Sequence, residues 1–275
     1  MSSLKRLVQM ARSDLLVTPR YEEWLLKTNG NPVYSSETVA KLVAQLQAKQ
    51  RDRTAFFSAS AQGTCPRAQV FGVIGVPGAR ITDSNQVNIF LDGQWRHLRH
   101  QAGMLEAGII TDIERLTEFG GIIKGTLDGL NEIEWFGIEI KGIRTLAWII
   151  KDGPKQQHLR QIAAYFLAQP KLSKFALIYD DKATQEYMEF VVERDDPNMA
   201  LTIDLVERDI LSLGHYRDSK ELPPILKECA RGTGQTFRQC AFRFTCLGCS
   251  DYQEAEASAE GAQPIRLSRI KRRRS

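Results

Sequence analysis

The stretch IIKGTLDGLNEIEWFGIEIKGI, residues 122–143, decides the fold that we expect for this chain. Its two ends, 122–130 and 136–143, are apolar and rich in β-branched residues, and a short polar segment separates them. This pattern is typical of two antiparallel strands joined by a turn, here centred on residues 133–134. The stretch therefore predicts a β-hairpin at the centre of the molecule.

The hairpin brings two carboxylates and an ammonium group together. With the turn placed as above, Asp128 lies directly across from Glu139, and alternation along the strand puts Lys141 on the same face as Glu139. Burying these charges in an apolar strip costs several kcal/mol unless they are paired or bind a metal ion. Two close carboxylates favour a divalent cation that prefers oxygen ligands. A cross-strand ion pair between Glu139 and Lys141 is the simpler alternative.

Hydrophobic periodicity extends the hairpin into a sheet flanked by helices. Apolar residues at helical spacing follow Ser35 and Ser36, two candidate N-caps, and recur through Leu46. We expect further helices over 65–73, 93–107, 156–169, 201–213 and 223–230, and further strands over 86–92, 109–111, 175–179 and 187–192. The predicted fold class is α/β, or mixed α+β, with a central mixed sheet of about five strands.

A single domain over residues 1–250 accounts for most of the chain. We expect it to consist of a helical N-terminal part over 1–60, a core over 65–195 and a helical C-terminal part over 200–250. From 251 to 264 the sequence is rich in Glu, Ala, Ser and Gly without periodicity, which predicts a disordered linker. A basic tail follows and ends at residue 275.

The composition is that of a globular protein. Hydrophobic residues make up 43% and charged residues 25% of the 275 residues, which are ordinary values. No apolar run approaches the roughly 20 residues that span a bilayer, and no signal-peptide pattern follows the first basic residues. We therefore expect a soluble cytoplasmic protein with no membrane partner.

The net charge of +4 is unevenly distributed. Residues 266–275 contain six basic residues and no acid, so the rest of the chain carries a net charge of −2. Any affinity for nucleic acid must then come from local patches and from this tail, which includes Arg272, Arg273 and Arg274. We expect these arginines to bind DNA phosphates, with a merely solubilising end as the alternative.

The cysteines indicate a metal centre. Cys65 stands alone, whereas Cys229, Cys240, Cys246 and Cys249 fall within 21 residues. In a reducing compartment such clustering is typical of metal binding rather than of disulfides. Four thiolates complete the coordination of either structural zinc or an iron–sulfur cluster, and composition does not choose between them.

Two further motifs flank the hairpin. Gly93-x-x-x-His97 lies on the helix expected before it, where His100, one turn later, is an equally suitable ligand. Gln161-x-x-x-Tyr165 gives a polar stripe to the helix expected after it. The simpler interpretations are a structural histidine and an ordinary solvated helix face.

In this order the motifs resemble the PD-(D/E)XK nuclease superfamily, specifically its RecB-like branch, which includes AddB and phage or bacterial exonucleases. The match covers residues 93–165, and Cys65-Pro-Arg67 extends it toward the N-terminus. The resemblance implies a restriction-endonuclease-like core and metal-dependent hydrolysis of DNA as an exonuclease. Partners would be single-stranded DNA or duplex ends, together with a phage or host recombination protein.

The resemblance also implies roles for individual residues. His97, Asp128, Glu139 and the backbone carbonyl of Ile140 would hold Mg²⁺ or Mn²⁺, and Lys141 would orient or activate a water molecule. Gln161 and Tyr165 would position the DNA backbone, and Arg67 would contact DNA. Asp128, Glu139, Lys141, Gln161 and Tyr165 are therefore the expected catalytic residues.

The cysteines resemble the iron–sulfur clasp of AddB-like nucleases, which implies a [4Fe–4S] cluster on Cys65, Cys240, Cys246 and Cys249. The spacing of the last three cysteines is mirrored relative to those families, so Cys229 is the reserve ligand, and Zn²⁺ is the alternative metal. Two alternative functions remain at this stage. One is a non-catalytic DNA-binding protein with a zinc clasp, and the other is a CRISPR adaptation nuclease.

Overall fold

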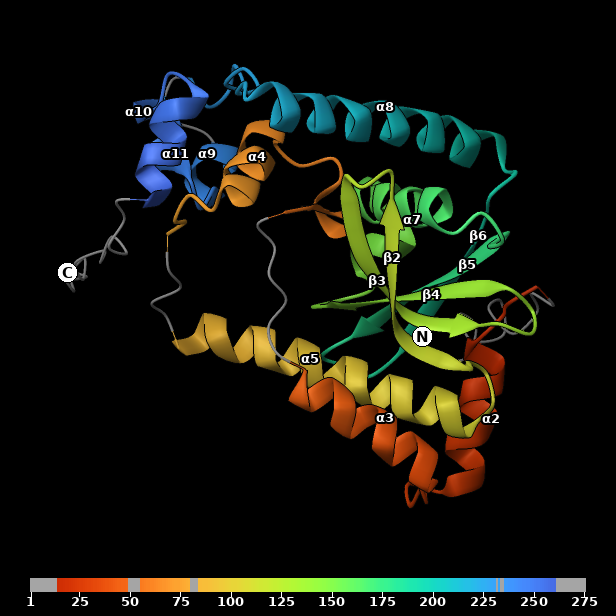
Figure 1. Cartoon of the computed structure of the whole chain (residues 1–275). Coiled ribbons are helices and arrows are strands. Elements are labelled where there is room, and N and C mark those ends of the chain that lie inside the picture. Colours follow the sequence, from red (N-terminus) through yellow and green to blue (C-terminus); the bar gives the residue numbers. More distant parts are fainter. Residues whose placement is uncertain (1–13, 49–54, 80–83, 231, 233–234, 261–275) are drawn as a thin grey trace.

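A mixed six-stranded sheet forms the centre of the molecule (Figure 1). The computed structural model describes residues 14–48, 55–79, 84–230, 232 and 235–260. The strands are β1 (Phe57–Ser58), β2 (Asp112–Phe119), β3 (Ile123–Asn131), β4 (Phe136–Ile143), β5 (Lys174–Asp181) and β6 (Tyr187–Glu193). Their order is β1-β3-β4-β5-β6, and β2 pairs with β3 as well. The predicted mixed α/β class is therefore confirmed, with one strand more than expected.

Helices cover both faces of this sheet (Figure 1). One side carries α2 (Thr18–Thr28), α3 (Ser36–Gln47) and the long α5 (Ser84–Glu106), and the other carries α7 (Gln156–Ala168) and α8 (Pro197–Ser219). The short helix α6 (Ala147–Asp152) joins β4 to α7. At one end of α8, a separate group of helices contains α4 (Pro66–Ile74), α9 (Gln235–Gln239), α10 (Arg243–Gly248) and α11 (Tyr252–Glu260). No described helix is both long enough and apolar enough to cross a membrane.

The central hairpin forms as its sequence predicts. Asn131 pairs with Phe136 and Gly129 with Ile138, which places the turn at residues 133–134. Strand β3 contributes Ile123, Leu127 and Leu130 to an apolar core beneath α7 and α8, whereas β4 contributes Phe136, Ile138 and Ile140 to a second core beneath α2 and α5. β5 then runs parallel to β4, and β6 is antiparallel to β5.

Buried carboxylates attach two helices to the sheet. Glu189 of β6 accepts hydrogen bonds from the backbone N–H groups of Leu16, Val17 and Thr18, at the start of α2. Asp180 of β5 is fully buried and holds α5. The helices on this face are thereby fixed by charged hydrogen bonds as well as by apolar packing.

Four expected elements are corrected by the structure. Residues 86–92 form part of α5 rather than a strand, and their apolar side chains at 87, 90 and 91 have helical spacing. Residues 109–111 precede strand β2 instead of forming one, and 223–230 are not helical. Part of the expected disordered linker is helix α11, whose Tyr252 and Ala255 are buried against neighbouring apolar residues. Tertiary contacts thus order a segment that lacks local periodicity.

Candidate active site

The candidate active site lies where β3 and β4 separate. The last registered pair of these strands is Gly129 with Ile138, although β3 begins at Ile123 and β4 continues to Ile143. Asp128 and Glu139, the residues predicted to face each other, come directly after that pair. Both are buried, and Oδ2 of Asp128 accepts a 2.7 Å hydrogen bond from the N–H of Ile140 across the split.

A close approach between side chains and backbone explains the glycine of the GTLD motif. A Cβ atom on Gly125 would lie 2.7 Å from Cβ of Ala59 and from the ring of Tyr165. Any larger residue at this position would have to displace Ala59 and Tyr165, because these contacts are too short. Gly125 therefore allows α7 to pack closely against the split.

His97 reaches the site from α5. Its Nδ1 lies 3.2 Å from Oδ1 of Asp128. The negative charge of Asp128 raises the pKa of His97 to about 9, against the opposing effect of burial. Gly93, one turn earlier, has open space where a side chain would be.

Glu114 of β2 completes a three-residue cluster that the sequence analysis missed. Oxygen atoms of Glu114 and Asp128 and a ring nitrogen of His97 all lie within 4.8 Å of one another. Glu114 has a φ of 51°, in the left-handed region, and it lies between the pairs Ile113↔Gly129 and Arg115↔Leu127. Such backbone strain concentrates at functional sites. No motif in the sequence marks Glu114, because its position depends on how β2 pairs with β3.

Gln101 fixes this cluster from α5. Its Nε2 donates to Oε1 of Glu114 at 3.0 Å and to the backbone oxygen of Asp128 at 2.8 Å. Gln101 is completely buried. It lies one turn after His97, so one face of α5 both supplies His97 to the cluster and orients two acids.

Glu139 and Lys141 form a second part of the site with α7. Nζ of Lys141 lies 2.6 Å from Oε1 of Glu139 and donates to Oε1 of Gln161 at 2.9 Å. Nε2 of Gln161 donates to Oε1 of Glu139 at 2.9 Å and to the hydroxyl of Tyr165 at 2.8 Å. That hydroxyl in turn donates to the backbone oxygen of Thr126 at 2.7 Å.

The pKa values of Glu139 and Asp128 are shifted in opposite directions, although the two carboxylates are neighbours. Burial, followed by the charge of Asp128, raises the pKa of Glu139 to about 7. Burial also acts to raise the pKa of Asp128, but the charge and hydrogen bond of His97 outweigh it and lower that pKa. Asp128 therefore stays ionised, while Glu139 takes up a proton near neutral pH.

The residues present fit a divalent cation. Two carboxylates and one imidazole cluster at the split, and Oε2 of the neighbouring Glu139 is buried with no hydrogen-bond partner in the described chain. A buried carboxylate oxygen without a partner is costly, and a cation satisfies it. Oxygen donors with one nitrogen suit Mg²⁺ or Mn²⁺.

Three residues that were expected to contact DNA are buried. Tyr165 and Gln161 form hydrogen bonds with the backbone oxygen of Thr126 and with Glu139, and their contact with DNA stays a prediction. Arg67 is also buried, and it donates to the backbone oxygens of Pro223 and Cys249 at 2.8 and 2.5 Å. Its DNA-binding role is corrected to a structural one.

His100 is excluded as the ligand that replaces His97. It is buried, and its Nε2 lies 3.0 Å from Oδ2 of Asp180. The same carboxylate oxygen is 3.0 Å from Arg96 and 3.5 Å from Arg99. Asp180 thus binds Arg96, which precedes His97, and Arg99 and His100, which follow it. These contacts fix the rotation of α5. The tail arginines Arg272, Arg273 and Arg274 lie outside the described residues.

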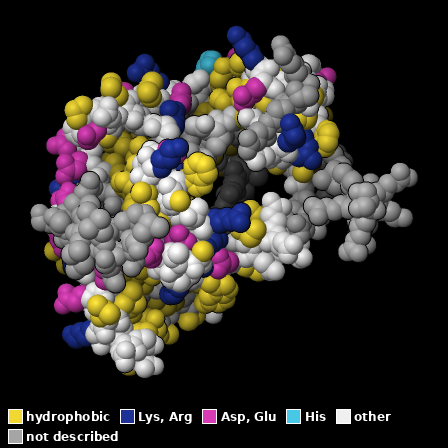
Figure 2. All heavy atoms as spheres, turned by 180° about the vertical axis from the view of Figure 1, so that it is seen from behind, with side chains coloured by type: hydrophobic (Ala, Val, Ile, Leu, Met, Phe, Trp, Pro, Cys, Tyr) yellow, Lys and Arg dark blue, Asp and Glu magenta, His cyan; other side chains and the backbone are white. Residues whose placement is uncertain are grey.

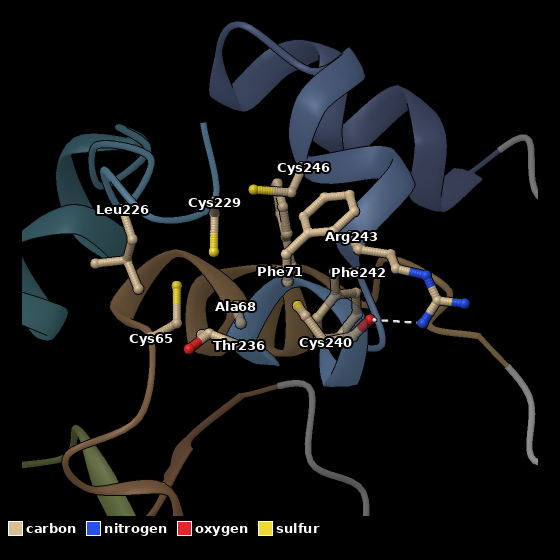
Figure 3. A pocket seen from close by; sticks show the side chains of 11 residues that line it. Cys65, Ala68, Phe71, Leu226, Cys229, Thr236, Cys240, Phe242, Arg243 and Cys246 are labelled. Carbon is tan, nitrogen blue, oxygen red and sulfur yellow. Dashed lines mark hydrogen bonds between the residues drawn. The ribbon is translucent and has the colours of Figure 1, made fainter. Parts of the chain in front are cut away.

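The cysteines form a second candidate site far from the split in sequence (Figure 3). Sulfur-bearing side chains of Cys65, Cys229, Cys240 and Cys246 line one pocket between α4 and the C-terminal helices. Cys249 is not among them. It is buried beside Ala255, and its sulfur lies 3.8 Å from the hydroxyl of Ser258. The reserve residue Cys229 therefore takes the place predicted for Cys249.

Comparison with known proteins gives distant structural matches. No family model and no curated protein matches the chain. A crystal structure described as SSO0001 is 19% identical, with a TM-score of 0.44 over 76% of this chain and 93% of the other. An alkaline exonuclease, LHK-Exo from Laribacter hongkongensis, is 19% identical, with a TM-score of 0.42 over 61% of this chain and 92% of the other. Its complex with dAMP gives 17% identity and a TM-score of 0.43, over 61% and 90% of the two chains.

Proposed function

We propose that this chain is a nuclease that hydrolyses DNA phosphodiester bonds with Mg²⁺ or Mn²⁺, acting as an exonuclease. The observation that carries the proposal is the cluster of His97, Glu114 and Asp128 at the split between β3 and β4. The ion pair of Glu139 with Lys141 adjoins this cluster. Figure 2 shows a hollow between the part of the molecule that contains the sheet and the C-terminal helices, and basic side chains lie at its rim.

The ligands of the cation would be His97, Glu114, Asp128 and Glu139, with the carbonyl of Ile140 as a further candidate. When bound, the cation lowers the pKa of a water molecule and offsets negative charge on the phosphate. The N–H of Ile140 and the amide of Gln101 hold Asp128 and Glu114 in place for this task. Because these donors come from the rigid sheet and one helix, the site is organised before any ligand binds.

Lys141 acts as a cation rather than as a base. Burial opposes its charge, but Glu139 and Asp128 more than compensate and raise the pKa of Lys141. Its ammonium group is held between Glu139 and Gln161. From there it orients the attacking water by hydrogen bonding and offsets charge that develops on the phosphate.

For the cysteine pocket we propose a [4Fe–4S] cluster on Cys65, Cys229, Cys240 and Cys246. Tetrahedral zinc would bring its sulfurs to about 3.8 Å from one another. A [4Fe–4S] cluster also takes four thiolates, so Zn²⁺ on the same four cysteines is the alternative. Either metal would fasten α4 to the C-terminal helices.

Digestion of an end-labelled oligonucleotide tests the nuclease. The wild-type protein should shorten the DNA with Mg²⁺ or Mn²⁺ and not in EDTA. Asp128→Asn and Lys141→Ala should each lose at least about 1000-fold in rate, equivalent to roughly 4 kcal/mol. Asp204→Asn, at an exposed position of α8, is the matched control and should cleave normally. DNA binding without cleavage under every divalent metal would instead support a non-catalytic DNA-binding protein.

A further inference from the structure

Helix α6 is fixed at the edge of the sheet where β4 and β5 end. Leu146 and Ile149 are buried in the core, which sets the rotation of the helix. The N–H of Leu146 donates to Oδ2 of Asp181 at 2.9 Å, and Asp181 is paired with Ile143 at the end of β4. The side chains of α6 that point outward are therefore presented by a rigid support.

Both ends of the segment that carries α6 lie beside the active site. Arg144 follows Lys141 by three residues, so their Cα atoms are at most about 10 Å apart. At the other end, the N–H of Lys155 donates to the hydroxyl of Tyr179 at 3.0 Å. Tyr179 is the registered neighbour of Lys141 in the sheet. Residues 144–155 thus begin and end near the split, and we call this segment the α6 wall.

The chemistry of this wall fits a nucleic acid strand. Trp148 is 65% exposed, although its neighbours Leu146 and Ile149 are buried. Arg144, Lys151 and Lys155 are exposed. Arg96 and Lys182 pair with Asp92. In contrast, the side chains of these three cations form no salt bridge or hydrogen bond within the described residues.

We propose that Trp148 is a base-stacking platform for single-stranded DNA, with Arg144, Lys151 and Lys155 binding the backbone phosphates. Bases in a duplex are already stacked on one another, so only an unpaired strand offers a free base to the indole. Positive charge without internal partners complements the phosphates. The inference rests on the proposed nuclease function and adds its substrate class, an unpaired DNA strand entering along α6.

Binding of fluorescent oligo(dT) in EDTA tests the platform, because no cleavage takes place under this condition. Trp148→Ala should weaken binding by roughly 5- to 150-fold, the range for loss of one base–aromatic stack. Trp148→Phe, which keeps a stacking ring, should recover most of the affinity. Trp95→Ala removes another tryptophan, 60% exposed on α5, and should leave binding unchanged. Affinity for a blunt duplex should change little in all three variants.

The phosphate contacts have their own measurement. Replacing Arg144, Lys151 and Lys155 together by Gln should reduce the slope of log affinity against log salt by about 2, at roughly 0.7 per contact on a single strand. An unchanged slope would overturn the phosphate assignment.

The outcomes separate this inference from the nuclease proposal. If the wild-type protein cleaves DNA but Trp148→Ala binds oligo(dT) as tightly as Trp95→Ala does, the platform is overturned and the nuclease stands. The exposed tryptophan would then be a candidate contact for a protein partner. Equal weakening for single-stranded and duplex DNA would also overturn the platform. A wild-type protein that neither binds nor cleaves DNA would overturn both proposals.

Discussion

The split between β3 and β4 and the cysteine pocket are both candidate metal sites, but the protein builds them differently. At the split, the acids are held by hydrogen bonds from Gln101, Ile140 and Gln161, which belong to long elements of the core. The cysteine pocket is lined by α4, a turn around Cys229 and the short helices α9 and α10. Its sulfurs have no comparable set of hydrogen bonds among the described contacts.

This difference predicts opposite consequences of metal loss. The split is organised by the fold, so removal of the proposed cation should abolish the proposed nuclease activity and leave the structure intact. The C-terminal helices are short and depend on few contacts, so metal bound to the cysteines would contribute directly to their folding. The following predictions test this contrast, from the largest expected effect to the smallest.

Cys229→Ser should have the largest effect on stability. It removes a proposed ligand, so the protein should lose its metal and several kcal/mol of folding free energy in the C-terminal helices. Metal analysis after anaerobic purification and limited proteolysis of residues 223–260 measure both. Cys249→Ser is the matched control, because Cys249 lies outside the pocket, and it should keep the metal. The reverse result would return Cys249 to the ligand set.

Glu114→Gln should lower the rate of DNA hydrolysis by roughly 100- to 1000-fold without loss of fold, because the variant keeps its size and loses a charged ligand. End-labelled digestion and a thermal melt provide the two readouts. Glu118→Gln alters an acid in the same strand that pairs with Lys124 and should cleave at nearly the wild-type rate. Equal rates for the two variants would remove Glu114 from the site.

Asp180→Asn should weaken Mn²⁺ binding at the split by about 10- to 100-fold, the usual effect of losing a group that orients a ligand. The expected cause is a loosened α5, which carries His97. Glu189→Gln is the matched control, because that buried carboxylate holds α2 instead. Titration calorimetry with Mn²⁺ distinguishes them. Equal losses of affinity in both variants would indicate general destabilisation rather than positioning of His97.

The affinity of the split for Mn²⁺ should rise with pH. A cation must displace the proton of His97, whose pKa is raised to about 9, so affinity should increase by at most tenfold per pH unit up to that value. Below about pH 7 the slope should steepen, because Glu139, with a pKa of about 7, must also lose a proton. In His97→Asn the slope between pH 7 and 9 should disappear. A slope that persists there would contradict this assignment of the proton.

Much of the site was predictable because it depends on spacing within elements. The turn between Asn131 and Phe136 brings Asp128 and Glu139 directly after the last registered pair of β3 and β4, and strand alternation places Lys141 beside Glu139. The same spacing rules also led to errors, among them the strand expected at 86–92, because a short apolar run fits a strand as well as a helix. In the structure, residues 86–92 belong to the first part of helix α5.

The amino-acid sequence by itself determined the central hairpin, the charged residues at the split and the presence of a cysteine group. Only the tertiary structure decided that Glu114 joins His97 and Asp128, that Cys229 replaces Cys249 in the pocket, and that Arg67 is buried. The physical reason is the range of the interactions. Alternation and helical periodicity fix which face a side chain occupies within its own element. Which elements then meet is set by packing between residues distant in the chain, and no local pattern records it.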